Sequence, residues 1–417
     1  MTHPYTSHDG TFKSAPGDGH EPIAVGTHVL TDGTVFSPVM VLKESAVEHN
    51  LSELARYCQD EGVLVAPHGK TTMSPELTRR QLSAGAWAIS AATPAQVRTL
   101  WQFGIPRVLL ANELVDRAGI DWIVRHLSER PDHEFLCYVD SLEGVRILDE
   151  TVRAVGADVA LDVLVEVSIP GARTGVRTQD EAERVARAAS ASQSLNLRGV
   201  AGYEGALVTG RGSATTATIT SYCQHVAQVA AVLDAQSLFS SNEVILSVGG
   251  GAYFDIVVDT LKTAVLPRSE PVIVIRSGSY VSHDDGLYRD ISAFSQPASA
   301  HTLQPALEIW GRILSRPEPD LAFADFGRRD VPFDQGLPLV RRVRNAEGLD
   351  ERPGDELSVT GLNDQHAYIR LPAADPLRPG DWIGCGISHP CTAFDKWRHI
   401  PLVDDNYTVT GSVTTYF

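Results

Sequence analysis

Residues 62–71 read GVLVAPHGKT, a short apolar run that ends in small and polar residues. Runs of about four to eight apolar residues are typical of strands buried on both faces of a parallel sheet. Seven similar runs follow, and longer segments of helical period separate them. The eight expected strands are residues 63–66, 87–90, 108–111, 135–139, 163–167, 199–203, 244–248 and 272–275.

This alternation predicts an α/β fold in which eight strand–helix units form a (β/α)8 barrel. The units take up about 220 residues, close to the ~250 residues usual for this barrel. A doubly wound open sheet is the alternative. The helices have clear start and stop signals: Thr93 is an expected N-cap, Pro94 suits the first helical position, Gln96 completes a capping box, and Gly104 is an expected stop.

After the barrel the pattern changes to short alternating segments bounded by turn residues, which predicts an antiparallel β domain. The expected strands there are residues 306–314, 356–360, 367–371 and 382–386. The expected division is a barrel at 38–300 and a β domain at 301–417 joined by 1–37, with a further strand from 21–40. Residues 45–59 predict an amphipathic helix that packs against the barrel.

The composition favours small-molecule chemistry. The 417-residue chain has 35 Lys and Arg against 52 Asp and Glu, and its formal net charge of −17 would repel nucleic acid and anionic membranes. No apolar run approaches the ~18 residues of a membrane helix, and residues 1–20 lack the apolar core of a secretory signal. We therefore expect a cytoplasmic protein. Its five scattered cysteines are expected to be thiols.

In a barrel, functional side chains gather at the carboxyl ends of the strands. The first strand ends in PHGKT, which places Lys70 at the barrel mouth. A lysine is costly to bury there as a cation, and lysines of lowered pKa commonly form Schiff bases. A solvated loop lysine is the alternative.

The seventh and eighth strands lead into glycine-rich loops at Gly249, Gly250 and Gly251 and at Gly278 and Ser279. Consecutive glycines let backbone N–H groups approach an anion, and these two loops commonly hold phosphate in barrels. A reactive lysine opposite a phosphate cradle suggests pyridoxal phosphate. The dinucleotide fingerprint Gly-x-Gly-x-x-Gly does not follow the first strand.

Two further groups of side chains could serve the site. Arg173 and Tyr203 follow the fifth and sixth strands, and their planar polar groups suit the edge of an aromatic ring, although each alone is more often structural. His389 and Cys391 stand two apart, on the same side of an extended strand, and imidazole with thiolate favours zinc. A buried thiol near a packed histidine is the alternative. Two protein ligands would leave coordination positions open, as a catalytic metal requires.

Taken together, these stretches resemble the fold-type III pyridoxal phosphate enzymes, and within them the metal-activated D-serine dehydratase and D-threonine aldolase group. The resemblance spans nearly the whole chain and implies a barrel of the alanine racemase type. It rests on residues 67–71, 173–175, 247–251, 277–280, 325–327, 334–338 and 389–392.

The resemblance implies that Lys70 carries the cofactor, that Arg173 or Tyr203 faces the pyridine nitrogen, and that the glycine loops hold the phosphate. It implies that His389 and Cys391 bind the metal. It also implies a homodimer in which the β domain of one subunit closes the barrel mouth of the other. The remaining expected cofactor contacts are His68, Ser247, Gly249, Gly250, Gly251, Gly278, Ser279 and Tyr280.

Two departures from the family pattern bear on the reaction. D-threonine aldolases usually present a carboxylate where this chain has Cys391, and a site for Mn²⁺ or Mg²⁺ would want that carboxylate. Zn²⁺ is therefore favoured as the metal, and elimination as the reaction. Relatives tend to have a histidine shortly after the Tyr-x-Gly of the sixth strand, where this chain has Ala206.

The expected function is therefore a dehydratase that converts D-serine or a related 3-hydroxy D-amino acid to a 2-oxo acid and ammonia. Cleavage by a 3-hydroxy amino acid aldolase on the same fold is the alternative. A racemase is less expected, because the sequence identifies no second base. A non-catalytic carrier of the cofactor is also less expected, because such carriers end with the barrel.

Overall fold

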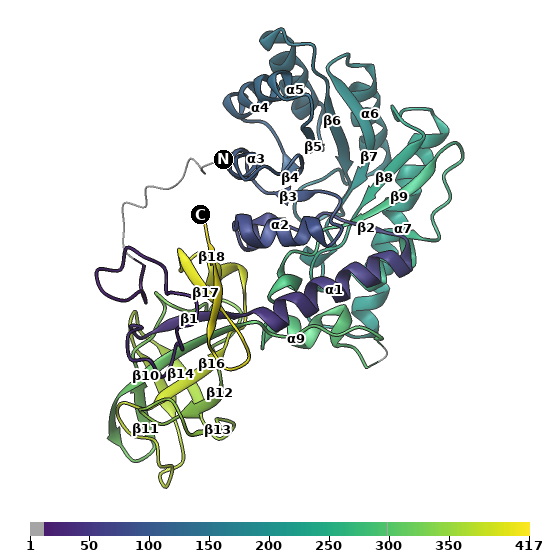
Figure 1. Cartoon of the computed structure of the whole chain (residues 1–417). Coiled ribbons are helices and arrows are strands. Elements are labelled where there is room, and N and C mark those ends of the chain that lie inside the picture. Colours follow the sequence, from purple (N-terminus) through teal and green to yellow (C-terminus); the bar gives the residue numbers. More distant parts are fainter. Residues whose placement is uncertain (1–11, 298) are drawn as a thin grey trace.

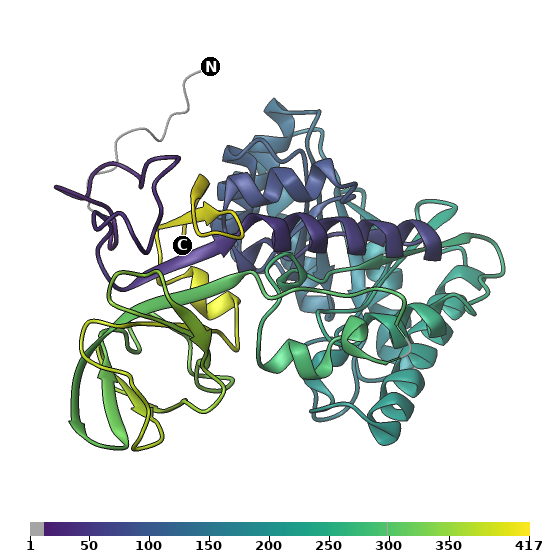
Figure 2. The same ribbon diagram turned by 60° about the horizontal axis from the view of Figure 1, so that its bottom comes forward.

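The computed structural model describes residues 12–297 and 299–417. It consists of an α/β barrel and a β domain that lies against one side of it (Figures 1 and 2). The barrel strands are β2 (Leu64–Val65), β3 (Ile89–Ala91), β4 (Arg107–Glu113), β5 (Glu134–Val139), β6 (Leu161–Glu166), β7 (Leu195–Ala201), β8 (Glu243–Ser247) and β9 (Glu270–Ile275). All eight expected strands are therefore present.

These strands are parallel and follow the order β2-β9-β8-β7-β6-β5-β4-β3. The two ends of the sheet meet through a parallel bridge between His68 and Ser90, and the Ser90 N–H donates to the Pro67 carbonyl at 2.8 Å. The sheet therefore closes into the predicted barrel, and the doubly wound alternative is wrong. Small and aliphatic side chains such as Ala66, Leu109 and Leu164 fill its interior.

Helices cover the outside of the barrel and connect its strands (Figure 1). Thr93 caps α3 as predicted, because its side chain accepts from the Gln96 N–H at 3.3 Å. The Gln96 side chain accepts from the Ala92 N–H, one residue before the position that a capping box would give. The barrel helices are α2 (Pro75–Ser83), α3 (Pro94–Gln102), α4 (Arg117–Glu129), α5 (Leu142–Val155), α6 (Gln179–Ala191), α7 (Ser213–Ala235) and α8 (Phe254–Leu261).

The expected amphipathic helix is α1 (Glu44–Glu61), which crosses between the barrel and the β domain (Figure 2). Its apolar face is buried, and Tyr57 contacts the rings of Phe254 and Phe294, each at 5.3 Å between centroids. The helix therefore packs against α8 and the short turn η4 (Ala293–Ser295), as predicted.

The β domain contains ten strands among the described residues. They are β1 (Val39–Lys43), β10 (Leu307–Glu318), β11 (Leu321–Ala324), β12 (Leu339–Arg344), β13 (Glu351–Pro353), β14 (Ser358–Leu362), β15 (Ala367–Arg370), β16 (Trp382–Gly386), β17 (His399–Val403) and β18 (Val409–Thr414). All but one of the pairings within this sheet are antiparallel, and β1 runs parallel to β17.

Strand β1 corrects the expected domain boundary, because it pairs with β10 and β17 in the β domain although the sequence analysis gave residues 38–300 to the barrel. Its apolar residues are buried on both faces, so its sequence resembles that of a barrel strand. The expected strand from residues 21–40 also differs: of the described residues before β1, which begin at residue 12, His28 alone forms a bridge, with Thr408.

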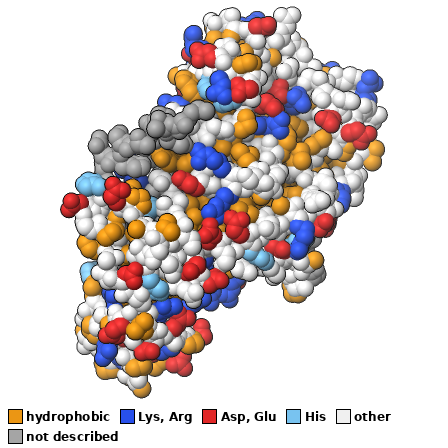
Figure 3. Space-filling model, viewed as in Figure 1, with side chains coloured by type: hydrophobic (Ala, Val, Ile, Leu, Met, Phe, Trp, Pro, Cys, Tyr) orange, Lys and Arg blue, Asp and Glu red, His pale blue; other side chains and the backbone are white. Residues whose placement is uncertain are grey.

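All five cysteines are free thiols, as expected. None of the described helices has the length and apolar character that a membrane crossing requires. On the face shown in Figure 3, basic and acidic side chains are interspersed.

Candidate active site

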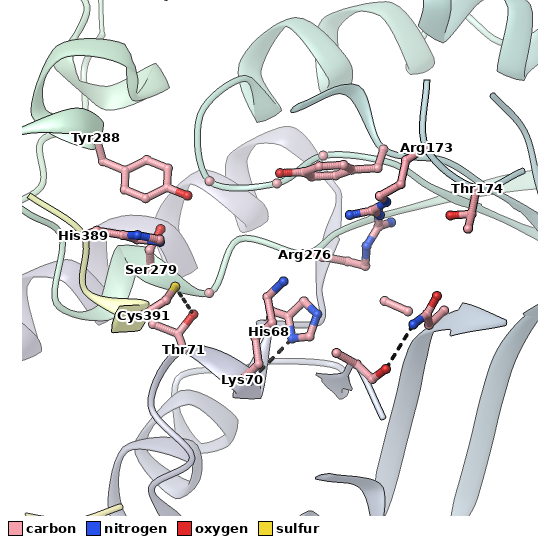
Figure 4. Close-up of a pocket in the computed structure, with 18 of the residues that line it drawn as sticks. His68, Lys70, Thr71, Arg173, Thr174, Arg276, Ser279, Tyr288, His389 and Cys391 are labelled. Atoms are coloured by element: carbon pink, nitrogen blue, oxygen red, sulfur yellow. Dashed lines mark hydrogen bonds between the residues drawn. The ribbon is translucent and has the colours of Figure 1, made fainter. Parts of the chain in front are cut away.

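A cavity of about 420 Å³ opens at the carboxyl ends of the barrel strands, where the β domain meets the barrel. In Figure 4, His389, Cys391 and Tyr288 lie on one side of it and Arg173 and Arg276 on the other, with Lys70 and His68 between them. The expected site residues that line the cavity are His68, Lys70, Arg173, Tyr203, Gly249, Gly250, Gly251, Gly278, Ser279, His389 and Cys391.

Lys70 lies in the short turn η1 (Gly69–Thr71), directly after the first barrel strand. The His68 ring accepts from the Lys70 backbone N–H through Nδ1 at 3.4 Å. Burial lowers the pKa of Lys70, and the charges of Arg173 and Arg276 lower it further, while Cys391 opposes them. The Lys70 amine is therefore more readily neutral, and hence nucleophilic, than a surface lysine.

His68 is neutral by the same physical causes. Burial holds the pKa of its imidazole well below the usual value, and the positive charges of Lys70, Arg276 and Arg173 add to this effect. A neutral imidazole beside Lys70 leaves the local positive charge with the lysine and the two arginines.

Glycine is needed in the two loops because a side chain at Gly251 or Gly278 would collide with residues of the cavity wall. A Cβ at Gly278 would lie 2.5 Å from the His68 carbonyl, and a Cβ at Gly251 would lie 2.7 Å from the Tyr288 ring. Gly249 has a φ of +100°, which other residues rarely adopt. These loops therefore keep backbone close to the space beside Lys70, as an anion cradle requires.

The structure adds an acidic residue to this cradle that the sequence analysis missed. Glu204 is fully buried, and its carboxylate accepts from the N–H groups of Gly249 at 3.1 Å and Gly250 at 2.8 Å. Those two donors therefore face a carboxylate, and Gly251, Gly278 and Ser279 are left as the loop residues for a phosphate. The sequence could have indicated Glu204 as a site residue, because it directly follows Tyr203 at the carboxyl end of a barrel strand.

Arg276 is a second missed residue, and it explains the position of Ser247. Its guanidinium donates to the Ser247 Oγ and to the Gly202 carbonyl, each at 2.6 Å. Ser247 thus lies behind the cavity wall and not on it. Arg276 stands two positions after Val274, which faces the barrel interior, so the period of a strand directs it inward.

Tyr280 is also not brought to the cavity. Its side chain is 3% exposed within the hydrophobic core, and its phenol interacts with Gln81. It lies in the turn η3 (Ser279–Val281), where successive side chains diverge, so Ser279 reaches the cavity and Tyr280 does not.

Arg173 and Tyr203 lie against each other. The Arg173 guanidinium carbon is 4.6 Å from the centre of the Tyr203 ring, a cation–π contact. The pair therefore forms one wall of the cavity, and both members remain at its surface.

His389 and Cys391 do not lie on an extended strand, which corrects that expectation. Cys391 begins the short helix α10 (Cys391–Phe394), because Pro390 has helical angles of −59° and −40°. Both side chains nevertheless reach the cavity. The Cys391 Sγ is 3.4 Å from the hydroxyl of Thr71, the neighbour of Lys70 in sequence.

The charge state of His389 is set by competing causes. Burial lowers its pKa, but hydrogen bonds with Cys391 and Asp334 outweigh burial and raise the pKa to about 9. No group of three or more His, Cys, Asp and Glu side chains in residues 12–297 and 299–417 is arranged to hold a metal. The His389–Cys391 pair thus offers two ligands only.

Comparison with known proteins identifies two family domains in the chain. The alanine racemase N-terminal domain matches residues 42–256, and the serine dehydratase domain matches residues 306–403. The 3-hydroxy-D-aspartate aldolase of Paracoccus denitrificans (strain Pd 1222) is 24% identical over 313 residues, which are 75% of this chain and 77% of that protein.

Two solved structures share the fold. The D-threonine aldolase from Filomicrobium marinum superposes with a TM-score of 0.73 at 23% identity, over 95% of this chain and 98% of that chain. The D-threo-3-hydroxyaspartate dehydratase from Delftia sp. HT23 gives a TM-score of 0.72 at 18% identity, over 92% of this chain and 98% of that chain. An alanine racemase-like barrel with a β domain is thus confirmed.

Proposed function

Since the chain belongs to the D-serine dehydratase and D-threonine aldolase family, whose members are lyases, we propose that it uses pyridoxal phosphate and Zn²⁺ to eliminate water from a 3-hydroxy D-amino acid. D-Serine or a related substrate would give a 2-oxo acid and ammonia. One observation carries this proposal: Lys70 from the barrel and the His389–Cys391 pair from the β domain line the same cavity.

The cavity residues fit pyridoxal phosphate. Lys70 supplies an amine of lowered pKa, and Gly251 and Gly278 keep backbone where a Cβ would collide with the cavity wall. When bound, the cofactor would withdraw electrons from the α-carbon of an amino acid. The Lys70 Nζ is the base that we assign to the α-proton, because it is a cavity amine that burial disposes toward the neutral form.

Three planar groups could meet the pyridine nitrogen: Arg173, Tyr203 and Arg276, of which Arg276 is added by the structure. Arg276 is fixed by Ser247 and Gly202, whereas Arg173 is exposed. A guanidinium is permanently charged, so an arginine there would disfavour a protonated ring nitrogen and weaken the electron withdrawal. The reaction would then depend more strongly on help for the departing hydroxyl group.

The His389–Cys391 pair is suited to give that help. Imidazole and thiolate favour Zn²⁺ over the harder Mn²⁺, and a divalent ion there would act as a Lewis acid toward the 3-hydroxyl group. One solved structure of a D-threo-3-hydroxyaspartate dehydratase is of a mutant described as being in the metal-free form. With two protein ligands, positions for substrate remain open.

Carbon–carbon cleavage is the second candidate, because relatives named as aldolases support it equally. That reaction requires a base for the proton of the 3-hydroxyl group. The family resemblance leads us to expect a histidine where this chain has Ala206, and the two histidines that line the described cavity are engaged with Lys70 and Asp334. These residues favour elimination.

The test is incubation of metal-replete protein with a panel of D- and L-3-hydroxy amino acids. Elimination predicts ammonia and a 2-oxo acid in equal amounts from D substrates. Glycine and an aldehyde as the main products would replace the dehydratase by an aldolase. Exchange of the α-proton without either product would instead indicate a racemase, and no turnover with any member would leave a cofactor carrier.

We also propose that the enzyme is a cytoplasmic homodimer, as the family resemblance implies. The exposed position of Arg173 at the cavity mouth supports a covering subunit. Sedimentation equilibrium would give twice the 45.1 kDa chain mass, and a mass of one chain would contradict the dimer.

A further inference from the structure

The loop between β11 and β12 places a carboxylate beside His389. The Asp334 Oδ2 lies 2.6 Å from the His389 Nδ1, although the two residues are 55 positions apart. The Thr392 hydroxyl donates to the other oxygen, Oδ1, at 2.8 Å. Both carboxylate oxygens are therefore directed by residues on either side of Cys391.

The hydrogen bond with Asp334 determines that the Nδ1 of His389 carries a proton. A carboxylate can only accept, so the proton of the contact must belong to the His389 Nδ1. When metal binding displaces the other ring proton, Nε2 is then the nitrogen that can offer a lone pair. Metal-binding histidines commonly donate their other N–H to a carboxylate in this way, and the partner fixes both tautomer and ring orientation.

The loop that carries Asp334 is itself held at this position. The Ser388 Oγ donates to the Leu337 carbonyl at 3.3 Å, and Gly336 adopts a φ of +118°, where a Cβ would approach the same hydroxyl. Ser388 precedes His389 directly. The loop and the His389 segment are thus tied together independently of the Asp334 contact.

We propose that Asp334 is a positioning residue for the metal site: it holds the His389 ring through Nδ1 and leaves Nε2 as the metal ligand. This inference rests on the proposed function, which assigns His389 to the metal. It gives Asp334, which has no role in that proposed function, a role at the metal site. Asp334 need not touch the metal itself.

The test measures Zn²⁺ affinity by competition with a chelator, without any turnover. Asp334→Asn and Asp334→Ala are expected to lower the affinity about 10- to 100-fold, the usual effect of removing such a partner. His389→Ala should lower it further. Asp334→Glu, which keeps the carboxylate, should recover part of the loss.

Cobalt substitution gives a second measurement. In the Co²⁺ form of Asp334→Ala, the thiolate-to-metal absorption of Cys391 should persist while the ligand-field bands shift, because the imidazole has lost its fixed orientation. Circular dichroism establishes that each variant is folded.

Asp395→Asn is the matched control. Its side chain is 41% exposed, as is that of Asp334, and it lies four residues after Cys391 beside Lys396. It removes the same charge without touching His389, so its affinity should equal that of wild type.

Variants of Asp334 that bind Zn²⁺ like wild type, with unchanged Co²⁺ spectra, would overturn the role of Asp334 alone. An equal loss in Asp395→Asn would overturn it too, by attributing the effect to net charge. Wild-type protein that binds no divalent ion would overturn both this inference and the metal of the proposed function.

Discussion

Lys70 comes from the barrel and Cys391 from the β domain, and both line the same cavity. Lys70 belongs to a turn that follows a barrel strand, and Cys391 begins a helix of the β domain. Single substitutions at the two positions should therefore have separable effects, one on the cofactor and one on the metal-assisted step.

Replacement of Lys70 by Ala is expected to abolish activity and, with it, the absorption band of the covalently held cofactor. The reason is that, in the proposed reaction, Lys70 would supply both the amine partner of the aldehyde and the base for the α-proton. Absorption spectra of the purified variant and an ammonia assay check this. Arg80→Ala, a surface cation that pairs with Glu44 and Glu48, serves as the control. Retention of both signals in Lys70→Ala would remove Lys70 from the mechanism.

Replacement of Cys391 by Ala should leave the cofactor bound while elimination falls at least about 100-fold, since loss of a ligand exceeds the effect of losing its supporting partner. Product formation and cofactor absorption, measured on the same sample, separate the two effects. Cys385→Ala removes a buried thiol of β16 in the same domain and should preserve turnover. Equal turnover of Cys391→Ala and wild type would exclude a catalytic metal at this thiol.

At the scale of elements, the ends of β4 and β6 place two acidic side chains in contact inside the barrel. Burial raises the pKa of Glu113, and its hydrogen bond with Glu166 raises it further. Glu113 therefore keeps its proton at pH values at which an exposed glutamate has lost it.

This pair makes stability depend on pH with a definite sign. Above the ordinary glutamate pKa of 4.5, the unfolded chain releases the proton of Glu113 and the folded chain retains it, so rising pH favours unfolding. Glu113→Gln removes this dependence and keeps the shape. Its free energy of unfolding, relative to wild type, should rise from pH 5 to pH 8 by up to about 1.4 kcal/mol per pH unit.

Chemical denaturation at several pH values measures this difference. Glu243→Gln, at an exposed position at the start of β8, is the matched control for the same substitution. A difference between Glu113→Gln and wild type that stays constant or shrinks as pH rises would show that Glu113 is ionised in the folded protein.

At the scale of the whole molecule, the residues of the proposed cofactor and metal sites come from different domains. The barrel supplies Lys70 and the glycine loops, and the β domain supplies His389 and Cys391, the two ligands that we propose for the metal. The domains meet at the Thr71–Cys391 contact of 3.4 Å. A change that abolishes metal binding should therefore leave cofactor binding intact, and a change that abolishes cofactor binding should leave metal binding intact.

Chelation should consequently abolish elimination and preserve cofactor binding and the fold. Protein treated with a chelator and then dialysed is expected to keep its cofactor absorption and circular dichroism while ammonia release falls to background. Zn²⁺ should restore activity better than Mg²⁺, because thiolate and imidazole are softer ligands than Mg²⁺ prefers. Full activity in protein shown to hold no metal would contradict the division.

The sequence by itself determined the barrel, since the strand and helix periods are local properties of eight separate segments, and parallel strands in a barrel bring their carboxyl ends together. Lys70, the glycine loops, Arg173 and Tyr203 followed from that rule alone. Tertiary structure alone decided that β1 joins the β domain, that Glu204 occupies the N–H groups of Gly249 and Gly250, and that Asp334 meets His389. These are pairings between distant segments, and the free energy of such contacts depends on which faces meet in space, which no local periodicity records.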